Sequence, residues 1–329
     1  MQTEIQPVLG VPQQRSRSYW TISLRRLLRK KVGVACLSVI VLMYGAGIFS
    51  AVVTPYGYND QNLVDPSTKA GGCRLCQGPS VKHPFGTDRL GRDVFTRIIY
   101  GLRTTVIITI TTLVTGSLAI GITMGLLAGY FGRLVDAVIM RVGEVTSAFP
   151  EIFLVLIIIA SVKPPVTEWV RGIEDTLGVD IIRLGVVDYL VLSLALAIFS
   201  WFGMARLVRG QVLQARENQY VEAAVAVGGS TPRILLRHIL PNVMGPVIVV
   251  VSAGLAAVAG SEIFLSFLGI GIQPPTPSLG LMIFENGSIA VLRTTPHLLL
   301  FPVGTLSVLL LTFSMLGDAV NDAFNPRAR

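Results

Sequence analysis

Apolar residues gather in six long runs that carry few charged side chains and are separated by polar segments. A helix that crosses a bilayer needs about 20 mostly apolar residues. The pattern therefore predicts six membrane-spanning helices, at residues 32–53, 104–128, 142–162, 189–207, 242–268 and 297–317. We expect helices because an open sheet would leave unpaired backbone groups in lipid.

The composition agrees with a polytopic membrane protein. Hydrophobic residues make up 52% of the 329 positions and charged residues only 14%, whereas soluble domains average about 25% charged. These values argue against a soluble enzyme, a disordered chain and a small disulfide-stabilised protein. The predicted fold class is an all-α polytopic membrane protein with one membrane domain.

The distribution of basic residues predicts the orientation. Sixteen of the 27 Lys and Arg residues lie before the first span, in the second and fourth connections and in the tail. Because cytoplasmic segments carry the excess of basic residues, both termini are expected in the cytoplasm. The net charge of +8 then reflects anchoring at the membrane lipid, and no nucleic-acid partner is expected.

This orientation divides the chain into five parts. A cytoplasmic segment (1–31) precedes the first helix (32–53), and an extracytoplasmic loop (54–103) leads to a core of five helices (104–320) and a cytoplasmic tail (321–329). Residues 19–31 mix apolar and basic side chains, as an interfacial helix does. An ordinary basic flank explains them equally well.

No enzyme signature is present in the sequence. None of the five lysines follows a glycine-rich phosphate-binding loop, the three histidines are far apart, and no HExxH motif occurs. We therefore expect no catalytic residue, metal site or bound cofactor in this chain.

The most informative segment is the connection at 206–241. Residues 219–227 are predicted to form a short helix that Gly228 and Gly229 end in a left-handed turn. Thr231 suits the N-cap, and Pro232 the first position, of a second helix ending near Pro241. The small side chains of Ala223 and Ala224 would let a partner approach, beside a fixed carboxylate on Glu222. A solvated hairpin is the alternative.

This connection resembles the EAA–Gly–LP coupling loop of permease subunits in binding-protein-dependent ABC importers. The matching positions are Glu222, Ala223, Ala224, Gly228, His238, Leu240 and Pro241. His238 stands where many such permeases have Ile, and His-Ile-Leu-Pro-Asn resembles the peptide branch of the family. The resemblance implies that the loop sits in a cleft of an ATPase subunit.

Three further segments resemble the same branch. They are 83–93, which includes Gly86, Asp88, Gly91, Arg92 and Asp93 at the outer mouth; 262–280, which includes Glu262, Ser266 and Gly269; and the end, with Gly317-Asp318 and Asn325-Pro326-Arg327. The matches span about residues 25 to 327. The chain is thus similar to the C-type permease of dipeptide, oligopeptide and nickel importers, which implies the type I permease fold in the inner or plasma membrane.

The resemblance also implies a function and partners. Six helices would form half of a translocation pathway for dipeptides or oligopeptides. A second homologous permease would form the other half, two ATPase subunits would bind ATP and Mg²⁺, and an extracytoplasmic solute-binding protein would deliver the peptide. The alternatives are a permease for nickel or another small solute, and an ion-coupled secondary transporter with Glu262 as its proton site.

Two features depart from the family. The 161–188 connection is longer than expected, and Cys73 and Cys76 add a CxxC pair to the first outer loop. A local disulfide is favoured because the loop faces an oxidising compartment. Free thiols and half a metal site are the alternatives, and Cys36 is expected to pack within the first span.

Charges and glycines inside the spans have open roles. Glu262 either faces the pore or bonds to a neighbouring helix. Glu144 and Glu151 are expected on one face of the third helix, in a structural ion pair with Arg141. At the outer mouth, Asp88, Arg92 and Asp93 either dock the binding protein or cap the second helix. The glycines at 121, 125 and 129 predict close helix packing inside the subunit.

Overall fold

The structure is a computed structural model that describes residues 19–61, 75–178, 182 and 184–324. Within these residues the chain is helical, and its only strand-like pairing is an isolated bridge between Thr87 and Asp93. Six helical runs are long and apolar enough to cross a membrane: Lys31–Ile48, Val94–Phe131, Glu151–Thr176, Val186–Arg216, Thr231–Phe267 and His297–Phe324. The predicted all-α class and the number of spans are therefore confirmed.

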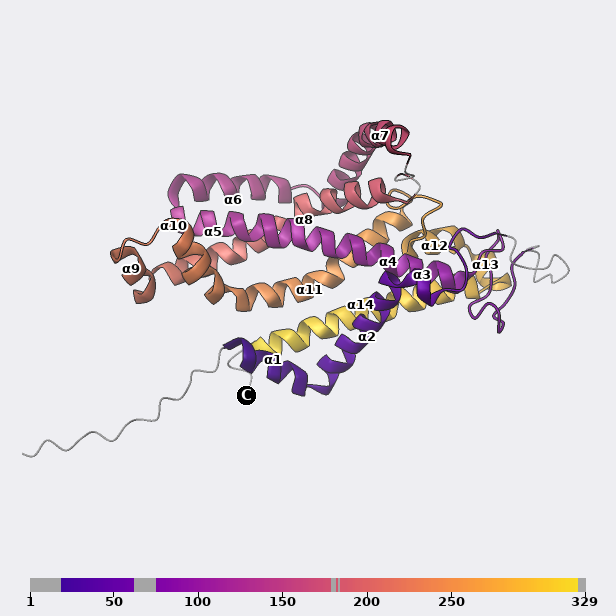
Figure 1. Ribbon diagram of the computed structural model, residues 1–329, viewed down its shortest axis with the longest axis horizontal. Coiled ribbons are helices and arrows are strands. Elements are labelled where there is room, and N and C mark those ends of the chain that lie inside the picture. Colours follow the sequence, from indigo (N-terminus) through magenta and orange to yellow (C-terminus); the bar gives the residue numbers. More distant parts are fainter. Residues whose placement is uncertain (1–18, 62–74, 179–181, 183, 325–329) are drawn as a thin grey trace, which may run out of the picture.

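The elements form an elongated bundle (Figure 1). In chain order they are α1 (Tyr19–Arg29), α2 (Lys31–Ile48), α3 (Ser50–Val53), α4 (Val94–Thr112), the π-helical segment η1 (Leu113–Gly121), α5 (Ile122–Phe131), α6 (Arg133–Ser147), α7 (Glu151–Leu177), α8 (Val186–Arg216), α9 (Gln219–Ala226), α10 (Thr231–Arg233), the π-helical segment η2 (Ile234–Ile239), α11 (Leu240–Phe267), α12 (Leu279–Asn286), α13 (Ile289–Thr294) and α14 (His297–Phe324). Helices α1, α9 and α10 lie toward one end of the bundle, and α3, α12 and α13 lie at the other (Figure 1).

The glycine-rich second span packs directly on α8. A Cβ atom added to Gly121, Gly125 or Gly129 would lie 2.6–2.7 Å from the Cβ atom of an α8 residue. Real Cβ atoms do not approach so closely, so only glycine allows this helix spacing. The prediction that these glycines pack inside the subunit is confirmed.

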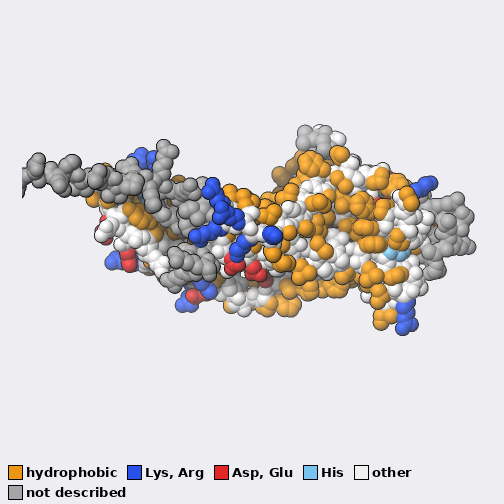
Figure 2. All heavy atoms as spheres, turned by 90° about the horizontal axis from the view of Figure 1, so that it is seen from below, with side chains coloured by type: hydrophobic (Ala, Val, Ile, Leu, Met, Phe, Trp, Pro, Cys, Tyr) orange, Lys and Arg blue, Asp and Glu red, His pale blue; other side chains and the backbone are white. Residues whose placement is uncertain are grey.

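Helices α2 and α14 combine a buried and an exposed apolar side. Tyr44 of α2 contacts Phe313 of α14 in the core, with ring centroids 5.5 Å apart. Their outer sides expose Leu42 and Leu311, and Figure 2 shows hydrophobic side chains over much of this face. Such an exposed apolar face suits contact with lipid. The ion pair between Lys30 and Asp322, 2.7 Å long, lies where α1 meets the end of α14.

The third span differs from the prediction. The expected helix at 142–162 is broken, because α6 ends at Ser147 and α7 begins at Glu151. Pro150 causes the break, since proline has no N–H and disfavours helical geometry at the residue before it. Helix α7 then continues to Leu177, so most of the expected 161–188 loop is helical.

The first span is shorter than predicted, since α2 ends at Ile48 and Ser50–Val53 forms the separate helix α3, whereas three other spans are longer. The second begins at Val94, inside the expected outer loop; the fourth continues past 207 to Arg216; and the sixth continues past 317 to Phe324. The second helix of the expected hairpin does not end near Pro241, because α10, η2 and α11 form one continuous helical run. Its N-cap is Ser230 and not Thr231.

Candidate functional site

Helix α9 projects at one end of the bundle and presents the motif found in the sequence. The side chains of Glu222 and Ala223 are exposed, whereas Val221 is 2% exposed and packs into a core made by α5, α8 and α11. Ala224 is half-buried against the same core. The helix is thus anchored on one side and open on the side that carries the carboxylate.

Gly228 ends α9 in the conformation that the sequence predicts. Its φ is +79°, which L side chains rarely adopt. The N–H of Gly228 donates to the carbonyl of Val225 at 2.9 Å, and the N–H of Gly229 donates to that of Ala224 at 3.0 Å. These bonds satisfy carbonyls at the helix end and fix the turn toward α10.

The residues 238–241 lie inside the helical run that leads from α9 into the membrane. His238 is half-buried at the end of η2, and its carbonyl accepts a hydrogen bond of 2.7 Å from the Asn242 side chain. Leu240 and Pro241 begin α11. Because Pro241 lacks an N–H, it fits best at the first turn of a helical segment. A displacement of α9 can therefore pass through the turn at Gly228 and Gly229 into the continuous helical run from α10 to α11.

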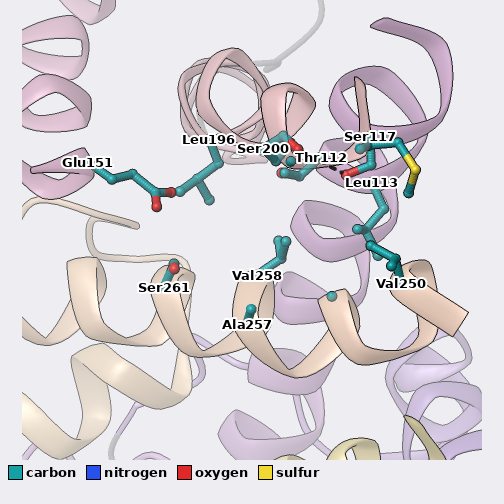
Figure 3. A pocket seen from close by; sticks show the side chains of 13 residues that line it. Thr112, Leu113, Ser117, Glu151, Leu196, Ser200, Val250, Ala257, Val258 and Ser261 are labelled. Carbon is teal, nitrogen blue, oxygen red and sulfur yellow. Dashed lines mark hydrogen bonds between the residues drawn. The ribbon is translucent and has the colours of Figure 1, made fainter. Parts of the chain in front are cut away.

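Two adjoining cavities lie between η1, α7, α8 and α11, with volumes of about 240 Å³ and about 490 Å³. They share Glu151, Leu196, Ala257 and Ser261. Figure 3 shows side chains from these elements turned toward a common space, with Ser261 and Val258 on α11 facing Leu196 and Ser200. Most of the lining is apolar or small.

Sequence reasoning did not find this cavity. Glu151 lies at the first position of α7 and points into it (Figure 3). Glu144 lies on α6 and forms an exposed 3.2 Å ion pair with Arg141. The expected shared face of Glu144 and Glu151 is wrong because Pro150 separates the two helices. One signal was present in the sequence: positions 250, 254, 257 and 261, three or four residues apart, mark one face of a helix.

Glu262 points away from the cavity and is fully buried. Its Oε2 accepts a hydrogen bond of 2.9 Å from Thr105 on α4, and its Oε1 accepts one of 3.1 Å from Ser266. The carboxylate therefore joins α11 to α4. Of the two roles left open by the sequence, this geometry favours bonding between helices.

Ser266 and Gly269 form the end of α11. The Ser266 hydroxyl accepts a 3.3 Å hydrogen bond from the N–H of Ile272, and its carbonyl accepts one of 3.1 Å from the N–H of Gly269. Gly269 has a φ of +78°. Helix α11 therefore ends in a turn at Gly269.

The outer segment at 83–93 is folded in on itself. Asp93 caps α4 by accepting a 2.7 Å hydrogen bond from the N–H of Thr96, and its other oxygen lies 2.9 Å from His83 Nδ1. Gly86 and Gly91 have φ values of +79° and +71°. The exposed side chains in this segment are those of Pro84, Arg89 and Leu90.

Asp88 is the centre of a second polar cluster. Its carboxylate accepts hydrogen bonds from the N–H of Leu90 at 2.9 Å and from Nε of Arg92 at 2.7 Å. Arg97, 3% exposed in its side chain, lies 3.7 Å from Asp88 and 3.8 Å from Glu285. Of the three residues Asp88, Arg92 and Asp93, only Asp93 caps the second span, whereas Asp88 and Arg92 bond to each other within the outer segment.

The cysteines are divided between the described and undescribed parts. Cys36 is a buried free cysteine in α2, as expected for packing. Cys76 is buried, but Cys73 lies outside the described residues. The Cys73–Cys76 disulfide therefore stays a prediction. Asn325, Pro326 and Arg327 also lie outside the described residues.

Comparison with known proteins shows which protein families this chain resembles. Residues 121–329 match the model of the family described as "Binding-protein-dependent transport system inner membrane component". Residues 18–69 match "N-terminal TM domain of oligopeptide transport permease C". The two matches leave residues 1–17 and 70–120 uncovered.

Curated relatives extend the similarity to nearly the whole chain. The dipeptide transport system permease protein DppC of Alkalihalophilus pseudofirmus is 33% identical over 95% of this chain and 91% of its own. The oligopeptide transport system permease protein OppC of Bacillus subtilis is 31% identical over 96% and 92%. The glutathione transport system permease protein GsiD of Pectobacterium atrosepticum is 34% identical over 95% and 93%.

Among solved structures, a chain of the inward-facing MetNI methionine ABC transporter aligns with a TM-score of 0.48 and 18% identity, covering 68% of this chain and 96% of that one.

Proposed function

The chain belongs to the family of binding-protein-dependent transport system inner membrane components, and on this basis we propose that it forms half of a translocation pathway for short peptides. It is a multi-pass membrane protein of the ABC importer permease kind, related to dipeptide and oligopeptide permeases. In the proposed complex it pairs with a second, homologous permease. Two ATPase subunits supply the energy, and a solute-binding protein delivers the peptide from outside.

The observation that carries the proposal is the exposed helix α9, which a single tight turn joins to the helical run that ends in α11. Glu222 and Ala223 form an open surface on a helix whose other side is packed into the core. A carboxylate beside small residues suits a close contact with a cationic groove on a partner. We assign this surface to the ATPase subunit.

The proposed mechanism uses a shift between two states. ATP-driven closure of the ATPase subunits moves α9, and the run through η2 tilts α11, which lines the cavity. A partner can shift such an equilibrium only by contacting the two states differently. In this proposal that differential contact is made at α9.

The proposed orientation and cargo follow from the same arrangement. Helix α1 lies toward the same end of the bundle as α9 (Figure 1), so we assign that end and both termini to the cytoplasm. The cargo is proposed to be a dipeptide or oligopeptide. Because relatives include glutathione permeases, a peptide of two or three residues is the first cargo to test.

The test uses the full complex, co-expressed and reconstituted in proteoliposomes with its binding protein. Glu222→Lys should abolish ATP-driven uptake of a labelled tripeptide while membrane insertion stays normal, because the new charge repels the cationic groove. Glu217→Lys is the matched control: this exposed acid lies just before α9 and should leave uptake near the wild-type rate.

Two results would contradict the proposal. Uptake that stays coupled to ATP hydrolysis in Glu222→Lys would show that α9 is not the coupling surface. Uptake driven by an ion gradient without the ATPase subunits would instead support a secondary transporter.

A further inference from the structure

The cavity between α7, α8 and α11 contains one ionisable side chain. Among the described residues that line its two parts, Glu151 alone carries a charge, and the rest are apolar, glycine or hydroxyl-bearing. Ionisable residues within membrane spans are costly and are retained where they serve a function. Packing alone does not explain why a carboxylate lies at this position in the cavity.

Glu151 has no partner within the subunit. Across residues 19–61, 75–178, 182 and 184–324, no Lys, Arg or His forms an ion pair with it, and no donor bonds to its carboxylate. The buried Glu262, by contrast, has both carboxylate oxygens bonded. Glu151 is thus open to a cation that enters the cavity.

The hydroxyl groups around the cavity are mostly engaged with their own helices or neighbours. Thr112 donates to the Ser193 carbonyl at 3.2 Å, and Ser200 donates to the Ala197 carbonyl at 3.3 Å. Ser261, which lies on α11 across from Glu151 (Figure 3), has no side-chain hydrogen bond to any described residue. Glu151 and Ser261 are therefore the two polar groups available to a passing molecule.

The apolar residues that line the rest of the cavity indicate which kind of cargo it can accept. Leu196, Ala257 and Val258 offer apolar surface without directional groups, so they discriminate little between side chains. A pathway that carries many peptides gains most by contacting what all of them share. The shared cation of a peptide is its protonated amino terminus, for which a carboxylate is the strong hydrogen-bonding partner.

We propose that Glu151 is a specificity-determining residue for cargo, and that its carboxylate binds the peptide's amino-terminal ammonium group in the cavity, with Ser261 beside it. This inference rests on the proposed function, since it takes a peptide as the cargo. No Lys, Arg or His lines the described part of the cavity, so the peptide's carboxylate end finds no countercharge there. The peptide is thus oriented with its amino terminus toward α7.

The first measurement is uptake of a labelled tripeptide by the full complex in proteoliposomes at saturating binding protein. Glu151→Gln should reduce uptake by about tenfold to a hundredfold, the effect of losing one charge-assisted hydrogen bond. Glu151→Asp keeps the charge and should restore most of the rate. Glu144→Gln is the matched control, because that acid lies outside both cavities and should behave as wild type.

The second measurement separates a contact with cargo from a structural role. Tripeptides that carry a photoreactive diazirine on the first or on the last residue are cross-linked during turnover, and the sites are mapped by mass spectrometry. In the wild type, the first-residue probe should label Leu196 or residues 256–261, and the last-residue probe should label them far less. In Glu151→Gln this difference should disappear.

The outcomes distinguish the two proposals. If the wild-type complex imports peptide and Glu151→Gln imports it at the same rate, the proposed role of Glu151 is wrong and the proposed function stands. Equal labelling of the cavity by both probes in the wild type would lead to the same conclusion. A wild-type complex that imports no peptide overturns the proposed function, and the role of Glu151 with it.

Discussion

The hydroxyl of Thr105 on α4 donates a 2.9 Å hydrogen bond to Oε2 of Glu262 on α11, and both side chains are fully buried. Ser266 bonds the other oxygen of the same carboxylate. A buried polar group is stable only when its hydrogen bonds are made. The pair therefore links two spanning helices at a point where neither side chain lines the cavity.

Removing the donor should destabilise the subunit. Thr105→Val leaves one carboxylate oxygen of Glu262 without a partner, which costs about 1–3 kcal/mol. Thermal unfolding of the purified complex in detergent measures the loss. Thr115→Val is the control, because its hydroxyl bonds only to the Thr111 carbonyl of its own helix. Equal melting temperatures for Thr105→Val and the wild type would show that the link does not stabilise the fold.

The close packing of α5 on α8 predicts a contrast between two glycines. In Gly125→Ala the new Cβ would lie 2.6 Å from the Cβ of Val208, whereas Gly210→Ala meets nothing within 4 Å. Overpacking costs about 1–3 kcal/mol, so Gly125→Ala should melt at lower temperature and give less folded protein. Gly210→Ala should be as stable as the wild type. The reverse order would contradict this helix interface.

The turn after α9 predicts that backbone conformation, and not side-chain space, restricts position 228. A Cβ there meets nothing within 4 Å, but φ is +79°. A left-handed conformation costs an ordinary L residue about 1–2 kcal/mol, and the cost is smaller for Asn. Gly228→Val should therefore impair uptake, while Gly228→Asn should keep most of it. Equal uptake in the two variants would show that the turn is not needed for coupling.

The sequence predicted best the features that depend on local chemistry. Helix α9 was expected at 219–227 and runs from Gln219 to Ala226, because Gly228 ends it through its own backbone preference. The six spans were found because each has a long apolar run. These signals act within a few residues or within one helix, so a single sequence contains them.

Unlike the break at Pro150, two of the boundaries that were wrong depend on contacts between distant residues. The fourth span was ended at 207 because arginines follow, yet α8 continues to Arg216. Arg209 forms a 2.6 Å hydrogen bond with Asp136 of α6, and its charge is thereby compensated. Arg97 is likewise buried between Asp88 and Glu285. A search for charge-free runs cannot recognise charges that are paired across the fold.

The cavity could not be predicted for a similar reason. It needs residues from η1, α7, α8 and α11 at once, and their meeting depends on how the helices pack. Glu262 attracted attention as an acid inside a span, but packing turns it into the protein. Packing also turns Glu151, which was expected in an ion pair, into the open space.

The hydrogen bonds in the outer segment predict that Asp93 stabilises the fold and does not contact the binding protein directly. Asp93→Ala removes the cap on α4, a loss of about 0.5–2 kcal/mol, and leaves the buried His83 ring without its partner. Asp93→Asn keeps an oxygen that can accept from the N–H of Thr96, and Asn caps helices as well as Asp does. We therefore expect a clear fall in melting temperature for Asp93→Ala and a smaller one for Asp93→Asn.

The control for this prediction is Arg89→Ala, whose side chain is exposed in the same segment and whose loss should leave the melting temperature unchanged. Affinity of the complex for its binding protein is measured on the same samples. If Asp93 acts through the fold, affinity falls only together with stability. If Asp93→Ala lost affinity at an unchanged melting temperature, Asp93 would instead contact the binding protein directly, and its burial at 1% exposure would have to be relieved on docking.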